Sequence, residues 1–181
     1  MGITNSNKEL STDRIDCGGS FQVRLSLTAE PDIVTNPTDI VLILDRSGSM
    51  AGSAMANLKS GAKAFIDIIE ESTDGTANGQ IGSGSRIAIV SFADTATQDT
   101  QLITSVSDLK AAIDALNANG STNHADAFTK ASELLIPPSA NAPVMVMFTD
   151  GATTAGPNPS PIAAAARDAG TVIYTIGLSG S

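Results

Sequence analysis

The segment Asp39-Ile-Val-Leu-Ile-Leu-Asp-Arg-Ser-Gly-Ser-Met50 decides the predicted fold of this chain and the place of its candidate site. Residues 40–44 form an apolar run without the polar alternation of a half-exposed strand, so they predict a strand buried on both faces. The run ends in one carboxylate and two hydroxyls, and a glycine between the hydroxyls allows a sharp turn. Open α/β sheets build their sites at the carboxyl ends of strands. We therefore expect Asp45, Ser47 and Ser49 to lie together at such an edge.

Predicted strands and helices alternate along the rest of the chain. Further strands are predicted at 86–92, 143–149 and 171–177, an antiparallel edge strand at 100–103, and helices at 51–71, 107–116, 124–135 and 160–168. In the first helix, apolar residues recur every three or four positions, which gives one continuous apolar face: Met55, Leu58, Ala62, Phe65 and Ile69. The alternation predicts an α/β fold with a doubly wound, mostly parallel sheet, right-handed crossovers and helices on both faces.

The first 37 residues differ in character from the rest of the chain. Residues 1–19 are polar and without periodicity, and we expect them to form a leader. Residues 21–28 alternate between apolar and polar, which predicts a half-exposed strand, and Pro31 and Pro37 bracket a linker. We therefore divide the chain into residues 1–37 and a main domain of residues 38–181. The strand at 21–28 packs either on the edge of the main sheet or in a neighbouring β-module.

Composition narrows the class of protein without naming a site. A chain of 181 residues with 41% hydrophobic residues is long enough for one domain with a sizeable core. The net charge of −9 disfavours nucleic acid and anionic membrane surfaces as partners. No apolar stretch approaches the roughly 20 residues of a membrane span. Cys17 is the single cysteine, so it is either a free thiol or bonded to a cysteine elsewhere in a parent protein.

Two further segments carry oxygen donors of the same kind. Asn119-Gly-Ser-Thr-Asn123 is a polar loop that contains Thr122, and residues 144–149 form a buried strand followed by Asp150 and a glycine. With the D-x-S-x-S pattern, these segments resemble the metal-ion-dependent adhesion site of von Willebrand factor type A domains, which include the integrin I domains. The resemblance covers about residues 38–180. It implies a metal site with five ligands, namely Asp45, Ser47, Ser49, Thr122 and Asp150.

The donor set predicts which ion binds. Carboxylate and hydroxyl oxygens are hard ligands that suit Mg²⁺ or Mn²⁺, with Ca²⁺ as a further candidate, rather than zinc or copper. The resemblance implies that the ion keeps one position open for a Glu or Asp carboxylate of a partner protein. The family also continues through another strand and a closing helix. The chain is therefore expected to end before that last strand and helix.

Each candidate residue also has a simpler interpretation. Ser47 and Ser49 are common helix caps, and either could cap the helix that starts near residue 51. Arg46 is expected to face solvent or form a salt bridge, with a ligand contact as the alternative. His124 is expected in the first turn of a helix, with a place at the rim of the site as the alternative. Asp126 is expected at the surface rather than among the ligands.

Three classes of function remain open. The first is a metal-dependent binding or adhesion module of an extracellular or bacterial cell-surface protein, which the Ser/Thr/Asn/Gly-rich loops and low lysine count favour. The second is an intracellular assembly module, as in metal chelatases. An enzyme is disfavoured because the G-x-S-x-G elbow is absent and Ser47 stands where the phosphatase pattern has a second aspartate.

Overall fold

The computed structural model describes residues 2–10, 23–30, 36–136 and 140–178. The chain divides into two compact units, residues 1–35 and 36–181. In the first unit, strand β1 (Gly2–Leu10) pairs antiparallel with β2 (Val23–Glu30) in a sheet of their own.

The prediction of a leader over residues 1–19 is therefore wrong for Gly2–Leu10. This segment has no hydrophobic alternation, so its strand is defined by backbone pairing with β2, which a periodicity argument cannot detect. The predicted strand at 21–28 corresponds to β2 from residue 23 onward. Residues 21 and 22 and Cys17 lie outside the described residues.

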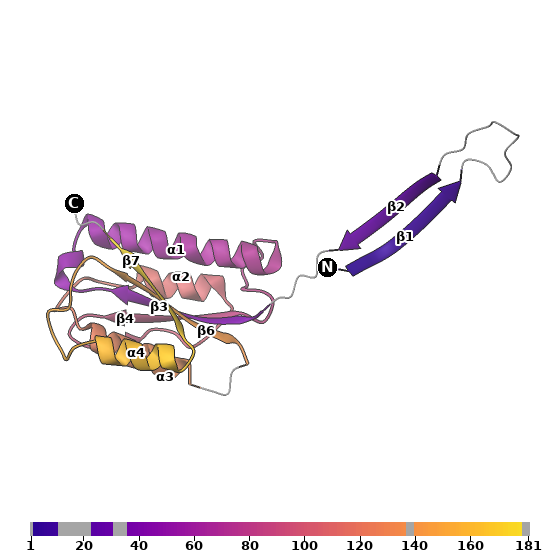
Figure 1. Ribbon diagram of the computed structural model, residues 1–181. Helices are drawn as coiled ribbons and strands as arrows, with labels where there is room; N and C mark the ends of the chain where they lie inside the picture. Colours follow the sequence, from indigo (N-terminus) through magenta and orange to yellow (C-terminus); the bar gives the residue numbers. More distant parts are fainter. Residues whose placement is uncertain (1, 11–22, 31–35, 137–139, 179–181) are drawn as a thin grey trace, which may run out of the picture. The chain divides into compact units, whose positions relative to one another are not determined.

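The second unit is a five-stranded sheet with helices on both faces, in the order β5-β4-β3-β6-β7. The strands are β3 (Thr38–Asp45), β4 (Arg86–Phe92), β5 (Ala96–Gln98), β6 (Ala142–Thr149) and β7 (Val172–Gly177). The helices are the short 3₁₀ helix η1 (Gly48–Met50), α1 (Ser53–Asp74), α2 (Val106–Asp114), α3 (His124–Leu134) and α4 (Ser160–Asp168). Helices α1 and α2 cover one face of the sheet, and α3 and α4 cover the other (Figure 1).

This architecture confirms the predicted doubly wound α/β fold. All neighbouring strands of the sheet are parallel except β5, which pairs antiparallel with β4. Within the described residues, β7 is the last element, and no helix has both the length and the apolar character needed to cross a bilayer.

The edge strand was predicted at the wrong place. It is Ala96–Gln98, not residues 100–103. Thr100 accepts a hydrogen bond from the Ile89 amide with its side chain, and Ile103 forms only an isolated bridge with Ile87. The apolar residues after Thr100 suggested a strand, but the Thr100 side chain takes the Ile89 amide, and regular pairing beyond it is limited to the Ile87–Ile103 bridge.

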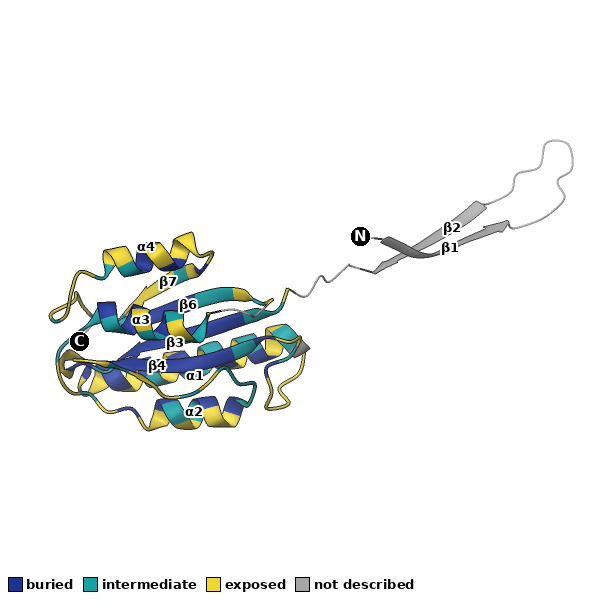
Figure 2. Ribbon diagram, turned by 90° about the horizontal axis from the view of Figure 1, so that it is seen from below, coloured by how far each residue is buried: buried dark blue, intermediate teal, exposed yellow. Residues whose placement is uncertain are grey.

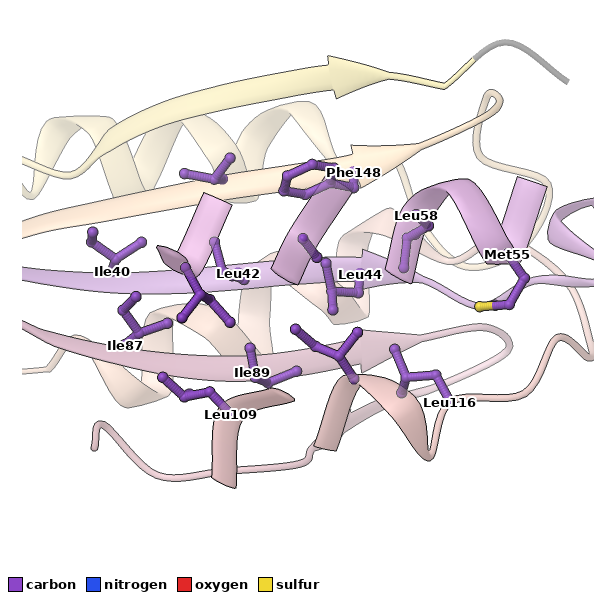
Figure 3. Packing of buried hydrophobic residues seen from close by; sticks show 14 of the residues in the cluster. Ile40, Leu42, Leu44, Met55, Leu58, Ile87, Ile89, Leu109, Leu116 and Phe148 are labelled. Atoms are coloured by element: carbon purple, nitrogen blue, oxygen red, sulfur yellow. The ribbon is translucent and has the colours of Figure 1, made fainter. Parts of the chain in front are cut away.

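The core lies on both faces of β3, as its unbroken apolar run predicts. Figure 3 shows Leu42 of β3, Ile89 of β4 and Leu58 of α1 among the side chains of the cluster on one face of the sheet. The central strands are buried, whereas much of β7 is exposed (Figure 2). Val172 and Tyr174 on β7 are 47% and 58% exposed. Burial therefore concentrates on β3, the strand that leads to Asp45.

An ion pair between the buried Asp39 and the partly exposed Arg86 lies at the other end of β3. The Asp39 carboxylate is almost fully buried and accepts bonds from Arg86 Nε at 2.9 Å and Nη2 at 2.7 Å. Asn141 Nδ2 donates to the same carboxylate at 2.8 Å. The hydrogen bond with Asp39 raises the pKa of Arg86. A cavity of about 560 Å³ between α3 and α4 also lies at this end, away from all five candidate ligands.

Replacing Arg86 by Met should destabilise the protein by about 3 kcal/mol, since a buried carboxylate loses its bidentate cation. The control is Lys63→Met, which breaks the exposed pair with Asp114 and should cost less than about 1 kcal/mol. Urea unfolding measures both changes. Equal losses in the two variants would show that the Asp39 pair does not anchor the sheet.

Candidate metal centre

The candidate ligands come together because β3 and β6 are paired in parallel. Leu44 is the register partner of Phe148, so Asp45 and Asp150 follow neighbouring strands at the same edge of the sheet. The loop at 119–122 lies against the turn after β3. Gly48 N donates to Gly120 O at 2.9 Å, and Asn119 N donates to Arg46 O at 2.8 Å. All three predicted segments therefore meet at one edge.

The turn after β3 is held by Asp45 itself. Asp45 Oδ1 accepts a hydrogen bond from the Ser47 amide at 2.8 Å, which folds the chain back over the carboxylate. Ser47 precedes η1 but makes no side-chain cap bond, and α1 is preceded by Gly52. The interpretation of Ser47 and Ser49 as helix caps is therefore wrong.

The serine hydroxyls instead form a chain of hydrogen bonds between the two carboxyl-bearing strands. Ser47 Oγ lies 3.1 Å from Ser49 Oγ, and Ser49 Oγ donates to Asp150 Oδ1 at 2.9 Å. Asp45 and Ser47 are fully buried, while Ser49 is exposed. The site is thus closed on the side of the core and open to solvent at Ser49.

Thr149 is a contact of the site that sequence reasoning missed. Its Oγ1 donates to Asp45 Oδ2 at 2.6 Å, so both oxygens of Asp45 accept hydrogen bonds. The signal was a hydroxyl at the last position of a buried strand, directly before Asp150. Thr149 fixes the orientation of Asp45 and links the ends of β3 and β6.

His124 lies behind this contact. It is the first residue of α3, and its Nε2 is 3.3 Å from Thr149 Oγ1. Its ring packs edge-to-face on Phe92 with centroids 5.3 Å apart. Burial lowers the pKa of His124, and the charge of Asp45 opposes that shift. The imidazole of His124 therefore contacts the hydroxyl of Thr149, and that hydroxyl in turn donates to Asp45.

Arg46 and Asp126 serve the scaffold. Arg46 Nη1 donates to Asn119 Oδ1 at 2.6 Å and its Nε donates to Ser91 Oγ at 3.3 Å, so it ties the turn to the loop at 119–122. Asp126 Oδ2 accepts from the Ala96 amide at 2.6 Å at the start of β5. Neither contact uses a candidate ligand.

Thr122 combines burial with an unused hydroxyl. The residue is 5% exposed, and both its amide and its carbonyl are hydrogen-bonded. Among the described residues, none forms a hydrogen bond with Thr122 Oγ1. Among the described residues no buried side-chain oxygen lacks a partner, so this unbonded hydroxyl reaches the surface, where an external ligand such as a metal ion can bind it.

The spacing of the oxygens fits a small octahedral ion. Metal–oxygen distances of about 2.1 Å place neighbouring ligands of an octahedron about 3.0 Å apart. The Ser47–Ser49 and Ser49–Asp150 oxygen pairs are 3.1 and 2.9 Å apart. Within the described part of the chain, no three His, Cys, Asp or Glu side chains are grouped to hold a metal, so a site here needs hydroxyl oxygens.

The fold and site define a class: a doubly wound α/β domain with an oxygen-lined site at the carboxyl ends of its central strands. Comparison with protein families identifies the class. The model of the von Willebrand factor type A domain matches residues 39–181, and the chain belongs to this family.

Individual relatives are distant and longer. The inter-alpha-trypsin inhibitor heavy chain H4 of Bos taurus is 26% identical over 160 residues, which are 80% of this chain and 16% of that protein. Proximal thread matrix protein 1 of the mussel byssus, solved with a zinc-occupied MIDAS motif, matches with a TM-score of 0.64 and 28% identity over 78% of this chain and 36% of its own. MIDAS abbreviates the metal-ion-dependent adhesion site.

A third matching structure is a bacterial pilus protein. The pilus adhesin SpaC of Lactobacillus rhamnosus GG matches with a TM-score of 0.67 and 16% identity, over 87% of this chain and 26% of its own. At that identity the match shows the fold alone. The chain thus spans between 16% and 36% of the length of these three proteins.

Gly120 should be sensitive to substitution because it combines a positive φ of 74° with a close approach to the Asp94 side chain. Gly120→Ala should lose about 1–2 kcal/mol from left-handed strain. It should also displace Asp94, whose Oδ1 accepts from the Ser121 amide at 2.9 Å.

The matched control is Gly75→Ala, because Gly75 has a φ of 69° but open space around it. It should show a similar loss of stability with no change at the site. Denaturation together with amide chemical shifts of 119–123 separates the two effects. Unchanged shifts in Gly120→Ala would contradict the tight packing of this loop.

Proposed function

We propose that residues 36–181 form a metal-dependent protein-binding module. In this proposal a divalent cation is held by Asp45, Ser47, Ser49, Thr122 and Asp150, and it binds a Glu or Asp carboxylate of a partner protein. The observation that carries the proposal is a chain of oxygens at octahedral spacing, together with the unbonded hydroxyl of Thr122 in the loop that packs on the turn after β3.

The ligand chemistry explains why such an ion would bind an acidic partner. Three of the five ligands are neutral hydroxyls, which leave much of the charge of the cation uncompensated and available to an outside carboxylate. The protein itself carries a net charge of −9, so its overall field repels acidic groups. A bound cation reverses the potential locally, and Ser49 marks the exposed side from which a partner approaches.

Mg²⁺ and Mn²⁺ remain the ions we propose, on the ground of the oxygen-only donor set. The zinc-occupied motif of the mussel protein shows that a motif of this type accepts zinc in that protein. Zinc generally binds more tightly than manganese to a given set of ligands, so zinc belongs in every binding experiment.

Location and context follow from the relatives as part of the same proposal. A pilus adhesin and a byssal thread protein are among the structural matches, which supports an adhesive module of an extracellular or bacterial cell-surface protein. The intracellular assembly module remains the alternative, because the same site would serve it. The separate pairing of β1 with β2 supports a distinct β-module before the domain. We propose no catalytic role.

Asp45→Asn tests the metal site, because it removes the charge of a buried ligand while an amide oxygen can still accept from the Ser47 amide. We expect affinity for Mg²⁺ and Mn²⁺ to fall at least about tenfold by calorimetry, with a folded protein in chelator. Asp67→Asn is the control, because Asp67 is exposed and paired with Lys110 on the surface.

The partner chemistry is tested with an immobilised library of Glu-containing peptides and a matched library in which Gln replaces Glu. Capture should require both the metal ion and Glu, and should vanish in chelator. Capture that persists in chelator, capture by the Gln library, or full metal affinity in Asp45→Asn would refute the proposed function.

A further inference from the structure

The segment between Asp150 and α4 is bound to the backbone of Thr122 through three consecutive residues, 153–155. We call residues 151–156 the strap. Thr154 N and Ala155 N donate to Thr122 O at 2.8 and 3.1 Å, and Thr153 Oγ1 donates to the same oxygen at 3.0 Å. In return, the Thr122 amide donates to Thr154 Oγ1 at 2.9 Å. Both backbone polar groups of Thr122 are therefore held by the strap.

The strap is itself fixed in shape. Thr153 Oγ1 also lies 3.0 Å from Ala155 O, so its single proton is shared between that carbonyl and Thr122 O. Gly156 has a φ of 77° and lies so close to Asn123 that an added Cβ would collide with its side chain. Asn123 cannot easily move away, because its Oδ1 accepts from the Asp126 amide and its Nδ2 donates to Asp94 O.

Burial distinguishes the two sides of this contact. Thr122 is buried, whereas Thr153 and Thr154 are exposed. The hydrogen bonds of these two threonines therefore contribute little to the core. Both threonines bond to the backbone of one residue, Thr122, whose side-chain hydroxyl is free for a ligand. A local positioning role explains this arrangement better than a role in global stability.

We infer that Thr154, assisted by Thr153, is a positioning residue for metal-dependent binding. It fixes the backbone of Thr122 and thereby the place of its hydroxyl. The strap begins directly after Asp150, so it also couples Asp150 and Thr122, which come from different loops. This inference rests on the proposed function, because it assigns a purpose to the position of Thr122 within the proposed site.

The physical reason is the stiffness of a β-branched side chain. Once φ and ψ of Thr122 are fixed on both sides, χ1 has few allowed values, so the backbone sets the position of Oγ1. Metal ligands must be held within roughly 0.5 Å of their working geometry. Outer partners of metal ligands typically change metal affinity by about 10–100-fold when they are removed.

The two strap threonines should differ in effect. Thr154 Oγ1 is the acceptor of the Thr122 amide, so its loss leaves that amide without this bond. The Thr122 carbonyl has three donors, so loss of Thr153 Oγ1 leaves two amides in place. Thr154→Val should therefore weaken Mn²⁺ binding about tenfold, and Thr153→Val clearly less.

The experiment compares Thr154→Val, which keeps the shape, with Thr154→Ser, which keeps the hydroxyl. In the full chain, calorimetry measures Mn²⁺ affinity, and NMR in chelator measures exchange of the Thr122 amide with solvent. We expect faster exchange and weaker binding in Thr154→Val, near-normal values in Thr154→Ser, and cooperative urea unfolding from a folded state in chelator for all three proteins.

The outcomes separate this inference from the proposed function. If the unsubstituted protein binds no divalent ion, the proposed function fails and the inference fails with it. If that protein binds Mn²⁺ but Thr154→Val binds equally well, only the inference is overturned. Equal weakening in Thr154→Ser, or unfolding of Thr154→Val in chelator, also overturns it, since either result would assign Thr154 a packing role.

Discussion

The parallel pairing of β3 with β6 is the constraint on which the rest of the site depends. The pairing places the ends of the two strands side by side, so the carboxylates that follow them share one edge. Both strands are buried over their last residues, so their register is specified by the core and not by the site. A slip by one residue would move Leu44 to the opposite face of the sheet and remove Asp45 from the turn.

The two carboxylates at that edge are hydrogen-bonded to neighbouring hydroxyl groups. Asp45 binds the Ser47 amide and Thr149, and Ser49 bridges to Asp150. Two carboxylates at one partly buried site would repel each other, and the intervening serine hydroxyls provide hydrogen bonds that reduce this cost. A cation at the same place would replace hydroxyl-mediated contact by direct charge compensation.

The motif residues could be predicted from the sequence because each follows a strand or loop with a clear pattern. The apolar runs before Asp45 and Asp150 predicted that both carboxylates lie at the ends of buried strands. Thr122 was predicted from the family resemblance. The strap threonines carry no such signal, because a hydroxyl in a polar loop looks the same whether or not it contacts a candidate ligand. The hydroxyl of Thr149 ends a buried strand, but its position in the sequence does not reveal its bond to Asp45. Their roles depend on contacts between segments about 30 to 100 residues apart.

The errors in the prediction have the same origin. β1 was missed because its polar sequence pairs through the backbone, and the edge strand was misplaced because the Thr100 side chain takes over a ladder position. The hydrophobic periodicity of a sequence indicates which side chains face a core. It gives no signal for a strand that is defined by backbone hydrogen bonds alone. Of the two strands with the most complete apolar pattern, β4 was predicted with its observed bounds and β3 to within two residues of them.

The central claim is that this edge of the sheet holds a divalent cation through hydroxyl oxygens. A crystal structure with Mn²⁺, read by its anomalous scattering, tests that claim most directly. We predict one strong peak with Ser47 Oγ, Ser49 Oγ and Thr122 Oγ1 in contact at about 2.1–2.2 Å and an open position facing solvent near Ser49. A protein that takes up Mn²⁺ only elsewhere, or leaves Thr122 Oγ1 out of its coordination, would contradict the account.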